Sequence, residues 1–285
     1  MKKFLLLCLY LFCKIDTTFA LSETNFTNSA DQNGERRIIL VAAGYNNKDW
    51  YKGNLDSVFA QEYQNYHLVY TDDASIDGTA DLVEAYVKEK GFESKVTLIR
   101  NKQRVGCPLA NQHRTIDACD DRDIIVILDA DDRLAHSKVL QYVNRVYSDS
   151  GVWLTYGQFI EHPSGVMGFC KDYPRNIVKR NAFREVGDIP SHMRTFYAGL
   201  FKQIKLEDLM LNGEFLTMSG DMAAMLPMIE MARDHYKFVP DVLYIYNAAN
   251  SLSEHRVSKT LQREVDLLVR SRSRYDKISS PVMNR

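Results

Sequence analysis

A buried-strand pattern that ends in aspartates constrains this chain more than any other feature. Residues 124–128 are Ile-Ile-Val-Ile-Leu, and Asp129, Ala130, Asp131 and Asp132 follow directly. Five consecutive aliphatic residues are typical of a strand that is buried on both faces near the centre of a parallel sheet. In open α/β sheets, ligands bind at the carboxyl ends of such strands. The sequence therefore predicts a ligand site immediately after residue 128.

The three aspartates also carry a chemical signal. Carboxylates this close together repel one another and add nothing to folding, so we expect a cation between them. Ligands that are all oxygen suit Mg²⁺ or Mn²⁺. The alternative is that these are ordinary turn and helix N-cap residues ahead of a helix that reaches residue 147.

Strand and helix patterns alternate along residues 38–147. Runs typical of buried strands cover residues 38–43, 66–71 and 96–99, and apolar residues at helical spacing follow each run. Gly91 stands where the second of these helices would end. This alternation predicts an α/β fold with a mostly parallel central sheet flanked by helices.

The pattern changes beyond residue 147. Residues 152–157 and 242–246 resemble strands and residues 222–233 a helix, whereas 161–219 mixes Gly, Pro, Arg and aromatic residues without a period. Irregular segments of this kind often wall a pocket. We expect a ligand-binding half over residues 38–147, an acceptor and catalytic half over 148–258, and a helical tail over 259–285. The tail is basic and amphipathic and could contact a membrane surface, although a solvated terminal helix is the simpler reading.

The first twenty residues have the pattern of a secretory signal peptide. Lys2 and Lys3 precede an apolar run over residues 4–13, and small residues stand near position 20. We therefore expect a lumenal or extracytoplasmic protein, with an uncleaved N-terminal membrane tether as the alternative. Residues 21–37 are polar and predict a flexible lead-in.

Composition excludes two classes of function. The net charge is −1, so bulk electrostatics do not favour a nucleic acid polymer as partner. Cys107, Cys119 and Cys170 lie outside the signal, and their wide spacing matches neither a zinc site nor a dense disulfide framework.

A second acidic pair follows another predicted strand. Asp72 and Asp73 come directly after residues 66–71. Right-handed crossovers bring the carboxyl ends of parallel strands to one edge of the sheet, so this pair should lie near Asp129 and Asp131. Two converging acidic groups favour a cation, or donors such as a nucleobase imide and ribose hydroxyls.

Four segments, taken in order, resemble a known family. The segments are Val-Ala-Ala-Gly-Tyr-Asn at 41–46, Thr-Asp-Asp-Ala-Ser-Ile-Asp-Gly-Thr at 71–79, the stretch 101–111 with Arg104 and Gly106, and Leu-Asp-Ala-Asp-Asp at 128–132. Together they are similar to the nucleotide-sugar half of family 2 glycosyltransferases. The resemblance covers residues 38–147. It implies the GT-A fold, a nucleotide-sugar donor, and Mn²⁺ or Mg²⁺ as cofactor.

The resemblance also implies roles for single residues. Asp129 and Asp131 match the D-x-D motif that holds the ion against the donor diphosphate, and His255 is a candidate further ligand. Asp221, in Ser-Gly-Asp at 219–221, matches the carboxylate base, with an N-cap as its alternative role. Arg194 could contact a phosphate or the acceptor, or form a structural ion pair. The implied nucleotide-sugar contacts are Ala43, Tyr45, Asp72, Asp73, Arg104, Asp129 and Ala130, and which of Asp72 and Asp73 reads the base stays open.

The predicted function is therefore a metal-dependent inverting glycosyltransferase that uses a nucleotide-diphospho-sugar, with UDP favoured, and a glycan, lipid or protein acceptor. Three other functions are compatible with parts of this pattern. A phosphorelay receiver domain should be shorter and carry a Lys after a later strand. A sugar-phosphate nucleotidyltransferase should carry a Gly-rich basic phosphate loop after its first strand, where residues 43–47 read Ala-Gly-Tyr-Asn-Asn. The third is a nucleotide-sugar-binding pseudoenzyme, and the presence of all the acidic motif residues, including Asp221, argues against it.

Overall fold

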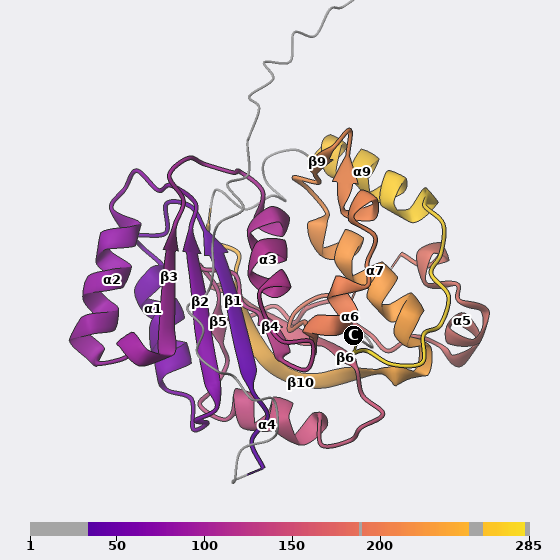
Figure 1. Cartoon of the computed structure of the whole chain (residues 1–285), viewed down its shortest axis with the longest axis horizontal. Helices are drawn as coiled ribbons and strands as arrows, with labels where there is room; N and C mark the ends of the chain where they lie inside the picture. The colour runs from indigo at the N-terminus through magenta and orange to yellow at the C-terminus, as the bar shows by residue number, and fades with distance from the viewer. Residues whose placement is uncertain (1–33, 188–189, 251–258, 283–285) are drawn as a thin grey trace, which may run out of the picture.

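The computed structural model describes residues 34–187, 190–250 and 259–282 (Figure 1). One eight-stranded sheet runs through the molecule in the spatial order β3-β2-β1-β4-β7-β6-β10-β5. Its strands are β1 (Ile38–Gly44), β2 (Tyr66–Asp72), β3 (Val96–Arg100), β4 (Ile124–Ile127), β5 (Arg133–Leu134), β6 (Leu154–His162), β7 (Thr195–Tyr197) and β10 (Tyr236–Asn247). A separate hairpin pairs β8 (Met210–Leu211) with β9 (Glu214–Phe215).

Helices flank the sheet. Figure 1 shows α1 and α2 beside the β3 end of the sheet, α5, α7 and α9 on the opposite side of the molecule, and α3 between these groups. The helices are α1 (Tyr51–Phe59), α2 (Thr79–Lys90), α3 (Pro108–Asp117), α4 (Val139–Val146), α5 (Arg175–Arg180), α6 (Ala198–Lys202), α7 (Gly220–Ala232) and α9 (Lys259–Ser271). Within the described ranges, no helix is long and apolar enough to cross a membrane.

The first half of the sheet is parallel, as the alternating pattern predicted. Strand β1 pairs with β2 on one side and β4 on the other, and β2 pairs with β3, all in parallel. Gly44 at the end of β1 lies opposite Asp72 at the end of β2, and Val41 lies opposite Ile127 at the end of β4. The carboxyl ends of the three strands therefore meet at one edge, which positions the site.

The second half of the sheet is mixed. Strand β7 lies between β4 and β6 and is antiparallel to both, whereas β10 runs parallel to β6. The two-residue strand β5 pairs antiparallel with β10. Leu134, which the sequence suggested as part of a helix reaching residue 147, instead belongs to β5, and α4 begins at Val139. A strand of two or three residues is too short to show a period, so β5 and β7 could not be predicted from the sequence.

The core is aliphatic around β1 and β4 and aromatic around β6 and β10. Helix α7 is buried from Met222 through Ala232, and all of these residues except Glu230 are apolar, as expected for a helix enclosed by protein. Helix α9 contacts α7, and its Val265 and Val269 are buried, whereas its Leu261 is exposed. Gly91 ends α2 with φ of 73°, as predicted. The proposed signal at residues 1–20 and most of the lead-in lie outside the described residues.

Candidate active site

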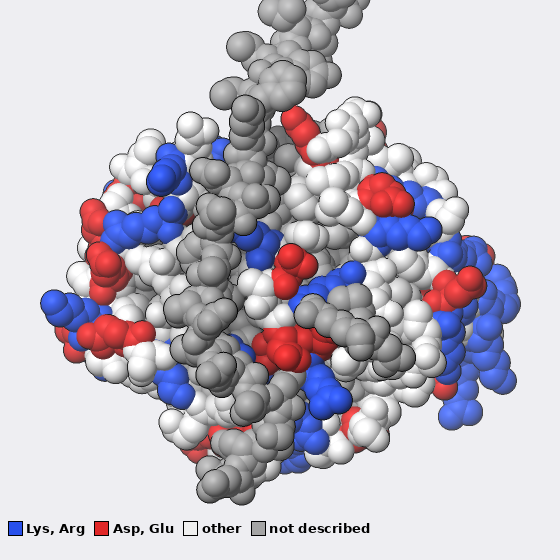
Figure 2. All heavy atoms as spheres, in the orientation of Figure 1, with Lys and Arg blue, Asp and Glu red and all other residues white. Residues whose placement is uncertain are grey.

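A cavity of about 410 Å³ opens at the edge where β1, β2 and β4 end. Its walls come from segments that are distant in sequence: the loops after these strands, the start of α3, residues 192–194, and the start of α7. Figure 2 shows acidic side chains gathered near the middle of this face, beside basic ones. Lining residues with polar side chains include Tyr45, Asp73, Arg104, Asn111, Asp129, Asp131, Asp132, His192, Arg194, Asp221 and Asn250.

The acidic segment after β4 is a tight turn that a side chain of α1 supports. The Asp132 backbone N–H donates to the carbonyl oxygen of Asp129 at 2.9 Å. Asn54 of α1 is fully buried, and its side-chain amide donates to the carbonyl oxygens of Asp129 at 3.1 Å and Asp132 at 2.8 Å. The turn is therefore fixed by backbone contacts, which leave its carboxylates available to the cavity.

The carboxylates of the turn accept hydrogen bonds from β10 and the residues after it. Asn250 donates its side-chain amide to Asp131 at 2.7 Å. The Tyr244 hydroxyl and the Asn247 N–H each donate to Asp132 at 2.6 Å. Burial raises the pKa of Asp131 to about 6 and raises that of Asp132 well above its ordinary range. The three donors are neutral and position the carboxylates, and a cation bound between these carboxylates would favour their charged forms.

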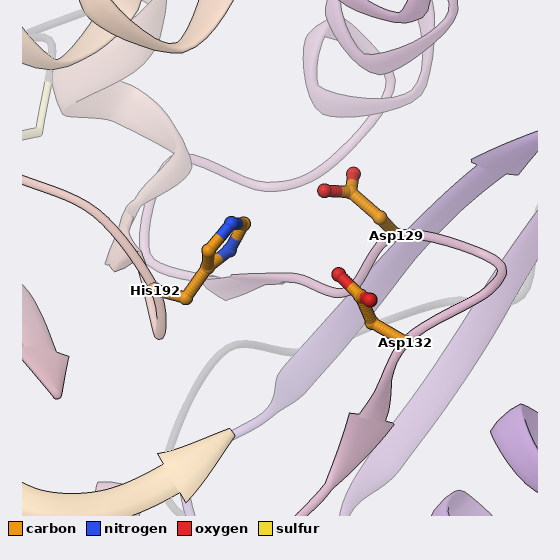
Figure 3. A group of neighbouring side chains, drawn as sticks. All are labelled: Asp129, Asp132 and His192. Carbon is orange, nitrogen blue, oxygen red and sulfur yellow. The ribbon is translucent and has the colours of Figure 1, made fainter. Parts of the chain in front are cut away.

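Asp129, Asp132 and His192 form a candidate cation site. Each offers a ligand atom, and these atoms lie within 4.8 Å of one another. Figure 3 shows the three side chains converging from two segments, the turn after β4 and the loop before β7. The predicted ligand Asp131 also lines the cavity, whereas His255 lies outside the described residues. His192 is thus the imidazole that the described part of the chain brings to the turn.

Arg194 connects the two acidic walls of the cavity. Its Nη1 lies 3.1 Å from Asp221 Oδ2, and its Nη2 lies 3.6 Å from Asp129 Oδ2. Its side chain is 7% exposed, and its Nε has no hydrogen-bond partner among the described residues. The sequence left open an ion pair or a ligand contact for this residue, and the structure has the ion pair.

Asp221 lies in the first turn of α7 and faces the cavity. One of its carboxylate oxygens accepts the N–H of Met222 at 2.8 Å, and the other meets Arg194. The preceding Ser219 has φ of 53°, a left-handed conformation that turns the chain into the helix. The side chain is about a third exposed, so a substrate can reach it.

The opposite end of the cavity has the features expected for a nucleotide. The Arg104 guanidinium lies 3.8 Å from the centre of the Tyr45 ring. Asp73 accepts the N–H groups of Val105 at 2.9 Å and Gly106 at 2.7 Å, which fixes the loop that carries Arg104. Asp72 lies away from the cavity and accepts the N–H of Ser75 at 3.0 Å. Of the aspartate pair, Asp73 is therefore the one at the cavity wall.

Close packing of the loop after β1 against the acidic turn explains why Gly44 and Ala130 are small. A Cβ on Gly44 would lie 2.6 Å from the Cβ of Ala130 and 2.0 Å from Asn47 Nδ2, so only glycine fits. Ala130 is fully buried in this contact, and its side chain does not line the cavity, whereas Ala43 does. The β1 loop thus lies directly against the acidic turn.

Several residues that reach the acidic turn could not be predicted from the sequence. His192, Tyr244, Asn54 and Asn250 carry no motif, and each reaches the acidic turn from a different segment. An alternating apolar pattern at residues 242–246 indicated a strand but not which face meets the turn. Only tertiary structure places these side chains.

Comparisons with known proteins agree with this geometry. The sequence model of glycosyl transferase family 2 matches residues 40–209. TuaG of Bacillus subtilis (strain 168), assigned as a teichuronic acid biosynthesis glycosyltransferase, is 22% identical over 102 residues, which is 36% of this chain and 38% of TuaG. The chain thus spans less than half the length of this curated relative.

Two solved structures share the fold. S. aureus TarS 1–349 in complex with UDP-GlcNAc superposes with a TM-score of 0.61 at 15% identity, over 82% of this chain and 65% of TarS. Mannosyltransferase PcManGT from Pyrobaculum calidifontis, in complex with GDP-Man and Mn²⁺, gives 0.58 at 20% identity, over 83% and 63%. Both similarities support the GT-A fold that the sequence predicted. Since the family match covers more than half of the chain and its acidic turn lies in the cavity, the protein belongs to glycosyl transferase family 2.

Proposed function

We propose that this protein is a metal-dependent inverting glycosyltransferase that moves a sugar from a nucleotide-diphospho-sugar to an acceptor hydroxyl. The observation that carries the proposal is the arrangement of Asp129 and Asp221 on facing walls of one cavity, with Arg194 between them. One carboxylate belongs to the turn suited to a cation and the other to a helix start suited to a base. A transferase of this kind needs both groups at one reacting centre.

The residues of the turn fit a divalent cation. Asp129 and Asp132 offer carboxylate oxygens and His192 an imidazole nitrogen, and the carboxylate of Asp131 is adjacent. Mn²⁺ accepts both ligand types, and Mg²⁺ favours the oxygens. When bound, the ion would neutralise charge on the departing diphosphate as a Lewis acid. Arg194, the cation already between the two walls, balances part of the remaining negative charge.

Asp221 is the proposed base. Its carboxylate takes the proton of the acceptor hydroxyl while that oxygen forms a bond to the anomeric carbon. The bond between the anomeric carbon and the diphosphate oxygen breaks, and the nucleoside diphosphate leaves with the electron pair. Attack from the face opposite the leaving group inverts the anomeric configuration. Arg194 holds the Asp221 carboxylate in place through the 3.1 Å contact.

The nucleotide would lie at the end of the cavity formed by Tyr45, Arg104 and Asp73. An aromatic ring and a guanidinium offer flat surfaces for a base, and the Asp73 carboxylate can accept from a base N–H. UDP is the first candidate. TarS has been solved with UDP and with UDP-GlcNAc, and the mannosyltransferase with GDP-Man, which supports the donor class. The acceptor is a glycan, lipid or protein.

Localisation follows from the N-terminus in this proposal. Residues 1–20 would direct the chain into the secretory pathway, where they are removed or remain as a tether. N-terminal sequencing of the chain purified from its own cell distinguishes the two, and a cytoplasmic chain that begins at Met1 contradicts both.

Calorimetric titration with UDP and GDP, each with and without Mn²⁺, tests the donor site. We expect one nucleotide to bind more tightly and to require the metal. A screen of sugar conjugates of that nucleotide, read as release of the free diphosphate in the presence of simple glycoside acceptors, then tests transfer. Failure of both nucleotides to bind under any metal would contradict the proposal.

A further inference from the structure

Tyr244 contacts every member of the candidate cation site. This residue of β10 is fully buried. Its hydroxyl donates to Asp132 at 2.6 Å and accepts the Asp129 backbone N–H at 3.1 Å. Its ring stacks on the imidazole of His192, with centroids 4.4 Å apart and planes 11° apart. One side chain therefore connects the turn after β4 to the loop before β7.

We propose that Tyr244 is a positioning residue that holds Asp129, Asp132 and His192 in the arrangement that binds a divalent cation, an inference that rests on the proposed function. The hydroxyl fixes the orientation of the Asp132 carboxylate and the backbone of Asp129. The ring fixes the plane of His192. Ligands that are already in place lose less conformational freedom when the ion binds.

The strand pairing directs Tyr244 to this position. Strand β10 is in register with β6 up to Val239 and resumes regular pairing at Tyr244, with two register shifts between them. Irregularities of this kind re-aim side chains near active sites. Tyr244 also pairs across to Leu134 of β5, the strand that leaves the acidic turn. The turn and the tyrosine are thereby joined by backbone as well as by side chain.

A neutral donor suits this role better than a charged one. A phenol hydroxyl is a neutral donor, and that of Tyr244 donates to Asp132 at 2.6 Å. A Lys or Arg at this point would neutralise Asp132 and compete with the metal. The phenol satisfies one lone pair of the carboxylate and leaves its negative charge for the ion.

Calorimetric titration of the full chain with Mn²⁺ alone tests the inference. Tyr244→Phe keeps the ring that stacks on His192 and removes only the hydroxyl. We expect it to bind Mn²⁺ about 10- to 100-fold more weakly than the wild type, as is usual when a partner of a metal ligand is lost. In transfer assays the half-saturating Mn²⁺ concentration should rise by a similar factor, and excess Mn²⁺ should restore kcat.

Tyr156→Phe is the matched control. Tyr156 is also a buried tyrosine of the sheet, and its hydroxyl donates to the Lys171 carbonyl at 2.7 Å, away from the acidic turn. This variant loses a comparable hydrogen bond and should bind Mn²⁺ as the wild type does. If Tyr244→Phe binds Mn²⁺ as tightly as the wild type, the inference about Tyr244 is wrong and the proposed function is unaffected. The same holds if both tyrosine variants lose Mn²⁺ affinity equally. Absence of any divalent-cation binding to the wild type overturns the proposed function as well.

A second measurement uses the unaltered chain, and so does not depend on the folding of a variant. A cation that binds Asp132 draws electron density from the oxygen to which the Tyr244 phenol donates. Titration with Mn²⁺ should therefore produce a tyrosine difference spectrum in the ultraviolet that saturates together with the calorimetric signal. Calorimetric binding without a tyrosine signal contradicts the role of the hydroxyl.

Discussion

The Arg194 guanidinium lies 3.1 Å from the carboxylate of Asp221, and this contact joins the two halves of the site. Arg194 precedes β7, whereas Asp221 begins α7. The other end of the same guanidinium faces Asp129 at 3.6 Å. The charge on the proposed base and the charge on the turn are thus balanced by one buried cation, which couples the orientation of the two carboxylates.

Replacement of Asp221 should lower the rate of sugar transfer and leave nucleotide affinity unchanged. Asp221→Asn keeps the shape of the side chain but cannot take a proton, so kcat should fall by about 10²- to 10⁴-fold. UDP or GDP affinity in the presence of Mn²⁺ should stay close to the wild-type value, since Asp221 lies on the acceptor side. Steady-state kinetics and calorimetry check the two parts. Asp117→Asn, an exposed aspartate of α3, is the control. A matching loss of nucleotide affinity would falsify this division of roles.

Replacement of Asp131 should weaken the metal-dependent binding of the nucleotide. Its carboxylate lines the cavity and accepts from Asn250 at 2.7 Å. Asp131→Ala removes one negative charge from the acidic turn, so the Mn²⁺-dependent gain in nucleotide affinity should shrink by about tenfold or more. The affinity without metal should change little. Calorimetry with and without Mn²⁺ measures both quantities, and an undiminished metal effect would place the ion elsewhere.

The ring of Tyr45 should supply stacking energy to the base. Tyr45→Ala should weaken nucleotide binding by about 1–3 kcal/mol, the usual contribution of one base stacked on an aromatic side chain. Tyr45→Phe keeps the ring next to Arg104 and should bind as the wild type does. Calorimetric affinities of the two variants provide the comparison. If the phenylalanine variant binds as weakly as the alanine variant, the hydroxyl rather than the ring carries the contact.

Gly44 tests the packing of the β1 loop against the acidic turn. In Gly44→Ala, the new Cβ would overlap Ala130 and the side chain of Asn47. The loops must separate, which should cost about 1–3 kcal/mol of stability and displace Tyr45 and the turn. Chemical denaturation and nucleotide titration should both show a loss. Gly187→Ala is the control, because a Cβ there meets nothing within 4 Å in the described part of the chain. Unchanged stability in Gly44→Ala would contradict the tight contact.

Asp123 gives the protein a pH dependence of stability outside the site. The residue lies just before β4, and burial raises its pKa from the ordinary 3.8 to about 6, although Arg37 at 3.7 Å partly opposes the shift. The folded state therefore holds this proton more tightly than the unfolded state. The stabilisation from protonation is full below about pH 4, is lost as the pH rises from 4 to 6, and amounts to a few kcal/mol.

The measurement for Asp123 is the free energy of unfolding of the wild type and Asp123→Asn over this pH range. The asparagine cannot ionise, so its stability relative to the wild type should increase between about pH 4 and 6 and then level off. Asp117→Asn, an exposed aspartate of α3 that does not contribute to the Asp123 shift, should show no such difference. A constant difference between wild type and Asp123→Asn across the range would contradict the raised pKa.

The order of strands and helices up to β4 and the location of the site could be predicted from the sequence. Buried parallel strands require runs of aliphatic residues, and their carboxyl ends must meet at one edge, so the pair Asp72 and Asp73 was expected near Asp129 and Asp131. Asp221 was found through its family motif. The α/β class and the family follow from the same local patterns.

Tertiary structure alone decided which groups complete the site. The sequence could not choose between Asp72 and Asp73, because two adjacent residues at a strand end point in opposite directions and the register decides which one faces the cavity. Nor could it find His192 and Tyr244, which reach the turn through the short strand β7 and the irregular pairing of β10. Contacts between distant segments leave no local period in the sequence, and these contacts position the functional side chains of this protein.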